Sequence, residues 1–175
     1  MPEDPLALET RRRVYRAVRS HPGSGARELQ RLSKTAWGEA VYHLDRLTEA
    51  GLIHRERGTH QDHYFAPEVP IPDRQVLGLL RSASARRVLE GLLELPASTL
   101  PDLAGRTGLS RGRLSVHLNR LMRIDLVRSG RSGRRRSFEL SDPERVMRLL
   151  VTYSDGFADE WIERILATWS ELFRP

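Results

Sequence analysis

The sequence predicts a mainly α-helical fold with small β-hairpins (α+β), in which one structural unit occurs twice and is followed by C-terminal helices. The first observation is an internal repeat, because residues 12–68 align with residues 86–142 at an offset of 74 positions without a gap. The second is that apolar residues in each copy recur with a helical period and then give way to two short strand-like segments. The third is a pair of apolar helical stripes after the second copy.

The repeat is carried by identical residues that are spread over the aligned length. Near matches such as Glu28 with Asp102 and Tyr64 with Phe138 support it. The identical pairs are Arg12/Arg86, Arg13/Arg87, Val14/Val88, Pro22/Pro96, Ser24/Ser98, Leu29/Leu103, Gly38/Gly112, His43/His117, Leu44/Leu118, Arg46/Arg120, Leu47/Leu121 and Leu52/Leu126. Each copy should therefore fold into the same elements in the same order.

The second copy predicts three short helices. The first spans residues 86–95, the second lies between Thr99 and Gly108, and the third begins after Ser110, a good N-cap residue. The third helix has Leu114, Leu118 and Leu121 about one turn apart, at i, i+4 and i+7, so all three should face the core. The first copy repeats this pattern with helices around residues 14–18, 26–33 and 35–50.

Two strands follow the third helix of the second copy. Residues 126–128 and 136–140 have strand character, and we expect residues 129–134, rich in glycine, serine and arginine, to form the loop between them. The first copy has a corresponding hairpin around Gly58. Three helices followed by a hairpin are the order of a winged helix-turn-helix. The sequence thus predicts winged helix-turn-helix domains over residues 1–70 and 73–142, and a C-terminal helical segment over residues 143–175.

The motif His-Leu-x-Arg-Leu occurs in both third helices, at residues 43–47 and 117–121. With the wing that follows, it resembles winged-helix transcriptional regulators of the MarR and ArsR type. The doubled arrangement, together with residues 142–150 and 157–159, is similar to archaeal-type regulators that carry two such domains in tandem. The resemblance implies a DNA-binding, non-enzymatic protein. One departure is Asp125, which stands where the first copy has Gly51 and makes the turn into the second wing a point to verify.

The positive charge is concentrated in the second copy. The chain has a net charge of +6, and residues 73–142 alone carry 14 basic and 7 acidic side chains. Double-stranded DNA is therefore expected to dock there first. The predicted contacts lie on the outward side of the third helix and along the wing: Ser110, Arg111, Arg113, Ser115, Asn119, Arg128, Arg131, Arg134, Arg135 and Arg136. A plain solvated face is the alternative for the helix, but repulsion among five wing arginines favours phosphate contact.

The first copy differs at the corresponding helix positions, which are Ala36, Trp37, Glu39, Val41 and Asp45. Its wing also mixes arginine with acidic residues, and phosphate repels carboxylates. We expect either weak auxiliary DNA contact or a protein-contact role for this copy. The residues expected to make the weak contact are Lys34, Thr35, Trp37 and Arg55.

The last predicted helix carries an apolar stripe formed by Phe157, Trp161, Ile165, Trp169 and Leu172. So large an aromatic surface should be covered. The sequence leaves two interpretations open: dimerisation through these helices, which would match paired half-sites on DNA, and packing onto the chain's own domains.

Several functions are not expected. The sequence contains no cysteine, nucleophile motif or phosphate-binding glycine loop, so we predict no enzyme activity and no cofactor. His54, His60 and His63 fit no known metal-ligand spacing, so no metal is expected. No membrane helix, secretory signal or small-molecule effector domain is evident, which predicts a cytoplasmic, nucleoid-associated protein. The expected function is transcriptional regulation; the alternative is an architectural protein that binds DNA with little sequence preference.

Overall fold

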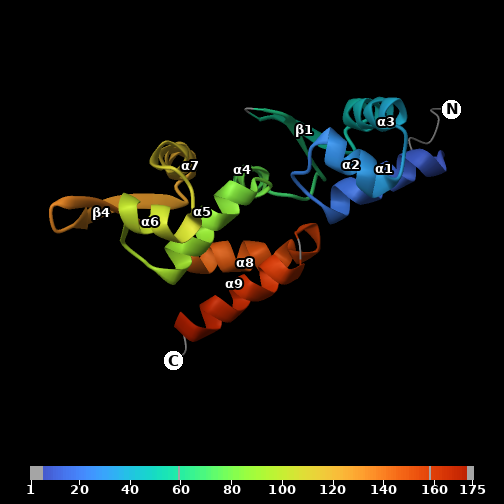
Figure 1. Ribbon diagram of the computed structural model, residues 1–175. Coiled ribbons are helices and arrows are strands. Elements are labelled where there is room, and N and C mark those ends of the chain that lie inside the picture. The colour runs from blue at the N-terminus through green and yellow to red at the C-terminus, as the bar shows by residue number, and fades with distance from the viewer. Residues whose placement is uncertain (1–5, 59, 158, 173–175) are drawn as a thin grey trace. The chain divides into compact units, whose positions relative to one another are not determined.

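A computed structural model describes residues 6–58, 60–157 and 159–172 of the chain (Figure 1). The chain divides into two compact units, Met1–Gly78 and Leu79–Pro175. Both units are mostly helical with a small antiparallel sheet, as the sequence predicts. None of the described helices is both long and apolar enough to cross a lipid bilayer.

Unit 1 is built from helices and one short hairpin. Its elements are α1 (Glu9–Ser20), α2 (Ala26–Ser33), α3 (Trp37–Glu49), β1 (His54–Arg57), β2 (Asp62–Phe65) and α4 (Ile71–Leu80), whose last two residues belong to unit 2. The three first helices surround one apolar core, and Ile53 and Tyr64 close it from the hairpin side. Helix α4 has no counterpart among the sequence-based expectations. A buried guanidinium fastens its first turn, because Arg74 donates from Nε to the Val69 carbonyl at 2.7 Å.

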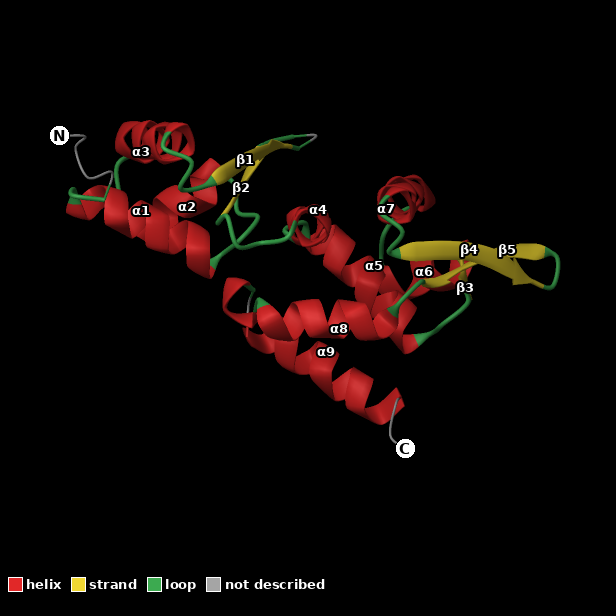
Figure 2. Cartoon of the chain, turned by 180° about the vertical axis from the view of Figure 1, so that it is seen from behind, coloured by secondary structure: helices red, strands yellow, loops and turns green. Residues whose placement is uncertain are grey.

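Unit 2 repeats the arrangement and adds two helices after it (Figure 2). Its elements are α5 (Ala83–Glu94), β3 (Ser98–Thr99), α6 (Leu100–Thr107), α7 (Arg111–Arg123), β4 (Val127–Ser132), β5 (Arg135–Leu140), α8 (Pro143–Thr152), the 3-10 turn η1 (Ser154–Gly156) and α9 (Asp159–Leu172). The sheet order is β3-β5-β4, with both pairs antiparallel. The short strand β3 was not among the predicted elements.

The second wing differs from the sequence-based expectation. A loop over residues 129–134 is wrong, because β4 continues to Ser132 and β5 begins at Arg135, leaving a turn of only Gly133 and Arg134. Gly133 has a φ of +61°, whereas the φ of Arg134 lies outside the left-handed region. Glycine with positive φ at the first turn position is the pattern of a type II′ hairpin, which suits the twist of the strands. Four of the five wing arginines therefore lie on paired strands, and Arg134 lies in the turn.

The repeat extends to the backbone at three corresponding places. Positive φ angles occur at Gly23, Lys34 and Gly51 in unit 1 and, 74 residues later, at Ala97, Gly108 and Asp125 in unit 2. Each pair has one glycine and one other residue in the left-handed region. Asp125, with a φ of 55°, adopts the conformation of Gly51, and Leu126 N–H donates to the Leu121 carbonyl as Leu52 does to Leu47. The turn into the second wing is therefore the same as in the first.

The third strand also has a counterpart in unit 1. Gly23 N–H donates to the Tyr64 carbonyl at 2.8 Å, and Tyr64 N–H donates to the Ser24 carbonyl at 3.1 Å. In unit 2 the corresponding pair, Ser98 and Phe138, aligns within the ladder of β3 and β5. The connection between the first and second helices is thus hydrogen-bonded to the wing in both units, and this fixes the base of each hairpin.

The C-terminal helices cover α5. Leu89 and Leu93 of α5 are buried, whereas their counterparts in α1, Tyr15 and Arg19, are partly or fully exposed. Helix α9 contacts α5, and the Arg164 guanidinium donates to Glu90 Oε1 at 2.9 and 3.1 Å. The extra apolar side of α5 explains why unit 2 requires additional helices to complete its core.

The aromatic stripe of α9 takes part in this packing. Phe157, Trp161 and Ile165 are buried within unit 2, and the Phe157 and Trp161 rings lie 5.2 Å apart. The Arg81 and Arg86 guanidiniums lie 4.7 and 5.5 Å from the Phe157 and Trp161 rings, respectively. For these three residues the arrangement is packing onto the chain's own helices, the second of the two interpretations. Trp169 is half-buried, and the side chain of Leu172 lies outside the described residues.

A buried histidine in unit 1 lies beside a buried arginine. Arg11 Nε donates to His43 Nδ1 at 3.5 Å, and both side chains are more than nine-tenths buried. Burial lowers the pKa of His43 below its usual value, and the Arg11 charge lowers it further. His43 is therefore neutral in the folded protein at neutral pH, which allows it to accept the hydrogen bond.

The left-handed positions predict opposite effects of two small substitutions. Gly108→Ala should destabilise the chain by about 1 kcal/mol, because alanine is strained at positive φ and no atom within 4 Å of the added Cβ introduces another effect. Ala97→Gly should stabilise the chain by up to about 1 kcal/mol, because glycine is not strained at positive φ. The greater conformational entropy of glycine in the unfolded chain offsets part of this gain. Urea unfolding of both variants measures this. Changes of the same sign would contradict the assignment of strain.

His43 predicts a loss of stability in mild acid. Because the folded pKa lies below the unfolded value of about 6.5, the unfolded chain binds the proton more readily, and the free energy of unfolding should fall as pH drops below about 6.5. His43→Gln keeps a hydrogen-bond acceptor without a titrating ring, so part of the pH dependence between about pH 7 and 5 should disappear. Urea unfolding at several pH values tests this, with the exposed His60→Gln as the control.

Candidate nucleic-acid interface

Helix α7 presents a polar side that begins at its N-terminus. Ser110 caps the helix, with its Oγ accepting from Arg113 N–H at 3.4 Å, so this predicted contact residue also has a structural role. Leu114, Leu118 and Leu121 face the core. The predicted contacts Arg111, Arg113 and Asn119 are exposed, and Ser115 is half-buried. The helix therefore offers guanidinium and amide groups on one solvent-facing side.

Two wing arginines have partners within the wing. Arg128 Nε donates to Glu139 Oε1 at 2.8 Å, directly across the ladder. Arg136 Nη2 donates to Ser129 Oγ at 3.1 Å, lies 3.7 Å from Met122 Sδ of α7, and its guanidinium carbon is 5.2 Å from the centroid of the Phe138 ring. The charge of Arg128 is thus balanced, while Arg136 is held in place toward α7 without a carboxylate.

The remaining wing arginines keep their charge. Arg131, Arg134 and Arg135 are exposed, and none of them forms an ion pair within the described residues. Arg131 lies directly opposite Arg136 in the ladder of β4 and β5. Like charges directly opposite one another destabilise a strand pair. The guanidiniums of Arg131 and Arg136 therefore repel each other, and an anion bound by both side chains would relieve this repulsion.

A shallow pocket lies between the start of α6, the middle of α7 and β5. Its volume is about 400 Å³, and its lining residues are Thr99, Leu100, Pro101, Ser115, Arg135, Arg136 and Phe138. Asp102, next to this lining, accepts from Thr99 N–H at 2.9 Å and from Thr99 Oγ1 at 2.6 Å. These hydrogen bonds lower the pKa of Asp102, with a smaller contribution from the charge of Arg135. The carboxylate is thus committed to capping α6.

The histidine of α7 contributes no positive charge at neutral pH. Burial lowers the pKa of His117, and the nearby charges of Arg120 and Arg113 lower it further. The positive field around α7 therefore comes from its arginines. In the first wing, the His63 ring contacts the backbone, because its Nδ1 lies 2.6 Å from the Gly23 carbonyl oxygen. No group of three metal-ligating side chains is found in the described part of the chain.

The corresponding surface of unit 1 is largely neutralised by its own carboxylates. Arg55 donates to Asp45 Oδ1 at 3.0 Å and lies 3.9 Å from Asp62 Oδ2. Trp37 of α3 is exposed, but the Arg27 guanidinium carbon stacks 4.0 Å from the centroid of its ring. The sequence indicates that the first copy is less positive at these positions. In the structure, ion pairs within unit 1 also balance the charge of Arg55.

Lys34 and Thr35 lie in the turn between α2 and α3. Thr35 is only 6% exposed, and its Oγ1 lies 3.0 Å from Ser33 Oγ, which places its hydroxyl inside the turn. Lys34 is exposed at the left-handed end of α2. Of the four residues expected to contact DNA in unit 1, Lys34 is thus the exposed cation without a carboxylate partner among the described residues.

Sequence reasoning missed several residues that shape this surface. Phe138, Ser129 and Met122 hold Arg136 in position, and the opposition of Arg131 to Arg136 depends on the register of the hairpin. The signal for that register was present in Gly133, since a single glycine at the first turn position favours a two-residue hairpin. The cradle of Phe138 and Met122 requires tertiary contacts that no local pattern carries.

The comparisons with known proteins assign both units. Residues 8–77 match a family described as an N-terminal HTH domain, and residues 81–128 match the winged helix-turn-helix DNA-binding family. The chain therefore carries two HTH domains in tandem, the second of the winged DNA-binding kind.

One relative and one solved structure are similar over about three-quarters of the chain. An uncharacterized HTH-type transcriptional regulator of Methanocaldococcus jannaschii is 26% identical over 133 residues, which are 76% of this chain and 34% of that protein. The chain thus spans about a third of the length of this distant homologue. The mRNA-binding domain of elongation factor SelB from E. coli, solved with SECIS RNA, is 20% identical, with coverage of 77% of this chain and 98% of that chain and a TM-score of 0.31.

The opposed arginines predict that the wing gains stability when one charge is reversed. Arg131→Glu would place a carboxylate opposite Arg136, turning a repulsive cross-strand pair into an attractive one, and should stabilise unit 2 by roughly half a kcal/mol. Thermal unfolding at low salt measures the gain, which should shrink in high salt. Arg128→Glu is the control, because it faces Glu139 and should destabilise the same hairpin.

Proposed function

We propose that the chain is a transcriptional regulator that binds double-stranded DNA, with α7 in the major groove and the arginine wing on the phosphate backbone or in the adjacent minor groove. The observation that carries this proposal is the set of exposed, uncompensated guanidiniums at Arg131, Arg134 and Arg135 beside an exposed polar helix. The match of residues 81–128 to a DNA-binding family supports it. We propose no enzymatic role.

The role proposed for α7 is base recognition. Arg111, Arg113 and Asn119 lie on its solvent-facing side, and guanidinium and amide groups form paired hydrogen bonds with guanine and adenine edges in the major groove. Ser110 and Ser115, nearer the helix start and the shallow pocket, suit phosphate contacts. Sequence preference would therefore come from the three longer side chains.

The role proposed for the wing is affinity. Its arginines lie on a hairpin closed by a two-residue turn, and each guanidinium that meets a phosphate releases counterions from the duplex. Arg136, held by Ser129 and Phe138, would contact the backbone close to α7, and Arg131 would share the same anion from the facing strand. Arg128, paired with Glu139, would contribute least.

Unit 1 is proposed to make weaker DNA contact. Its Arg55 is balanced by Asp45 and Asp62, and Trp37 is stacked by Arg27, which leaves Lys34 as the best-placed cation of the expected set. Dimerisation through α9 stays a prediction. Three residues of its expected interface, Phe157, Trp161 and Ile165, are already buried within unit 2, which leaves less apolar surface for a second copy. Light scattering of the purified chain decides it.

Removal of three wing charges should weaken binding to every duplex. The variant Arg131→Ala, Arg134→Ala and Arg135→Ala should lose at least about tenfold in affinity at low salt, and the slope of log affinity against log salt should fall by about 2 to 3. Fluorescence anisotropy with labelled duplexes of unrelated sequence measures both quantities. Unchanged affinity at low salt would refute the proposed role of the wing.

A matched control removes three exposed arginines that already have carboxylate partners. Arg12 is bound to Glu9, Arg19 to Glu68, and Arg148 lies near Glu144. The triple alanine variant at these positions changes the net charge by the same amount but should alter the salt slope by less than about 1. An equal loss in both triple variants would mean that only total charge matters.

Base recognition and architectural binding can be separated by the ratio of two affinities. A duplex selected by the chain from a random-sequence pool should bind at least about a hundredfold more tightly than random duplex at physiological salt if α7 reads bases. Arg113→Ala should then reduce the difference in binding free energy between the two duplexes by about 1 to 3 kcal/mol, while the affinity for random duplex stays nearly constant. A ratio near one in the parent chain would favour the architectural alternative instead.

A further inference from the structure

Unit 1 contains a basic pocket on the far ends of α1 and α2, away from the α3 residues discussed above. Its volume is about 300 Å³, and its lining residues are Arg13, Arg16, Ala17, Ser20, His21, Leu32, Ser33 and Lys34. Three of these are permanent cations at neutral pH, two carry hydroxyls, and none carries a carboxylate. Ala17 and the exposed Leu32 add apolar surface to the lining.

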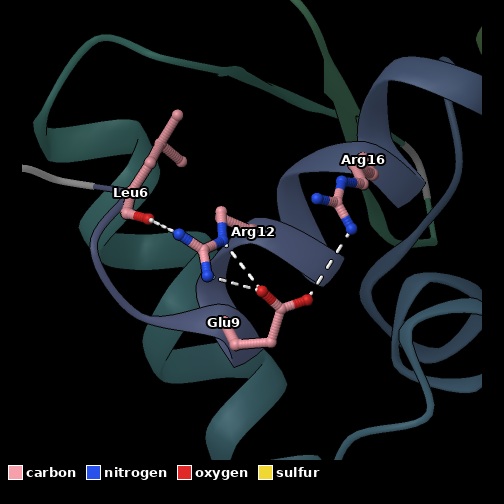
Figure 3. Close-up of polar contacts among 4 residues, drawn as sticks. All are labelled: Leu6, Glu9, Arg12 and Arg16. Atoms are coloured by element: carbon pink, nitrogen blue, oxygen red, sulfur yellow. Dashed lines mark hydrogen bonds and ion pairs between the residues drawn. The ribbon is translucent and has the colours of Figure 1, made fainter.

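Two of the three cations are available to a ligand. Arg13 and Lys34 are exposed, and neither forms an ion pair within the described residues. Arg16 is partly balanced, because its Nη1 lies 3.7 Å from Glu9 Oε1 (Figure 3). Glu9 is bound more closely by Arg12, with Nε and Nη2 at 2.9 and 2.6 Å from Oε2, and these hydrogen bonds lower the Glu9 pKa. Glu9 therefore stays anionic at the rim, attached to Arg12.

The repeat shows that the fold does not require the charges of Arg16 and Lys34, which correspond to Glu90 and Gly108 in unit 2, whereas Arg13 corresponds to another arginine, Arg87. In α1, Arg16 and Ser20 correspond to Glu90 and Glu94 of unit 2. There, Glu94 is paired with Arg106, Glu90 with Arg164, and Arg87 Nη1 donates to the Thr107 carbonyl at 3.2 Å. The same surface is thus closed by internal ion pairs in one copy and left cationic in the other.

Helix ends supply an ordinary reason for some of this charge. The carbonyl ends of α1 and α2 lie here, and a cation beside a helix C-terminus stabilises it by about 0.3 to 1 kcal/mol. That effect accounts for a cation at each end. It does not account for three cations around one recess whose lining lacks the carboxylates that unit 2 has at the same positions.

We propose that this pocket binds a phosphoryl oxyanion, with Arg13 and Lys34 as its main ligands and Arg16 and Ser20 as additional donors. Guanidinium and ammonium groups together form charge-assisted hydrogen bonds with the several oxygens of a phosphate. The phosphate belongs either to a nucleic-acid backbone or to a free phosphorylated molecule. The site shares Lys34 with the weak DNA contact proposed for unit 1 and goes beyond that proposal by assigning a bound oxyanion to the pocket and Arg13 as a main ligand.

The test uses the full chain with Arg131→Ala, Arg134→Ala and Arg135→Ala, so that the wing does not compete for anions. Calorimetric titration with pyrophosphate should show one saturable site per chain. Adding Arg13→Gln and Lys34→Asn should weaken that site at least about tenfold, since both charged ligands are lost. Asparagine is chosen at position 34 because it tolerates the positive φ of 52° found there.

The matched control in the same background is Arg31→Gln with Arg57→Gln. Both are exposed arginines of unit 1 outside the pocket lining, and the net charge changes equally. Pyrophosphate affinity should stay within about twofold of the parent. Absence of a saturable site in the parent, or an equal loss in the control, overturns the proposal. Circular dichroism melting of each variant confirms that the helices are intact.

The source of the phosphate is identified with the unmodified wing. If a duplex backbone occupies the pocket, Arg13→Gln with Lys34→Asn should also lower duplex affinity and reduce the salt slope by about 1 to 2. If a free phosphorylated molecule occupies it, pyrophosphate binding is lost while duplex affinity falls no further than with Lys34→Asn alone, which removes only the weak DNA contact proposed for unit 1. Both results support an oxyanion site. Neither depends on the wing, so a failed wing experiment leaves this test intact.

Discussion

The structure depends on a backbone constraint that both units share: the residues at three corresponding positions are held in the left-handed region. These residues end the second helix, turn the chain out of the third helix and set the loop after the first helix. Together they fix where the third helix and the hairpin lie relative to one another within each unit. Because an L-residue pays for positive φ at Lys34, Ala97 and Asp125, the surrounding packing and hydrogen bonds must hold these turns in place. The same frame can then carry different side chains without losing its geometry.

On that frame the two units have diverged mainly in where their charges are paired. Unit 2 uses carboxylates on α5 to bind Arg106 and Arg164, which closes its surface and attaches α9. It leaves Arg131, Arg134 and Arg135 of the wing without an ion pair among the described residues. Unit 1 pairs Arg55 of its wing with Asp45 and Asp62, and leaves Arg57 of the wing and the pocket cations Arg13 and Lys34 without an ion pair among the described residues. The uncompensated positive charge is therefore distributed differently in the two units: in unit 2 it is concentrated on the wing, whereas in unit 1 the wing keeps Arg57 and the rest lies beside α1 and α2, although their folds correspond residue by residue over much of their length.

Much of this fold was predictable from the sequence because the repeat supplied two independent readings of one pattern. The helices, the inward leucines of α7 and the equivalence of Asp125 to Gly51 follow from it. Strand β3 and helix α4 were missed, since a two-residue strand has no periodicity and Ile71–Leu80 begins in a proline-containing segment. The predicted wing loop is wrong because a segment rich in arginine, serine and glycine can still pair as strands when Gly133 closes a two-residue turn. For the interface, residue types on α7 were readable, whereas the ion pairing of Arg55 and the burial of Thr35 depend on tertiary contacts.

The two-residue turn at Gly133 and Arg134 also limits how the wing can change. Side chains alternate across a strand, so a shift of β4 by one residue against β5 would carry Arg131 to the opposite side of the sheet from Arg136, and would place Arg128 and Gly130 where Ser129 and Arg131 now stand. Insertions or deletions of a single residue near the tip would therefore separate the charged pair even if every arginine were kept. Among relatives of this domain, wing length should vary in steps that preserve the pairing, whereas the identity of residues at the turn itself is free to drift wherever glycine keeps the first position.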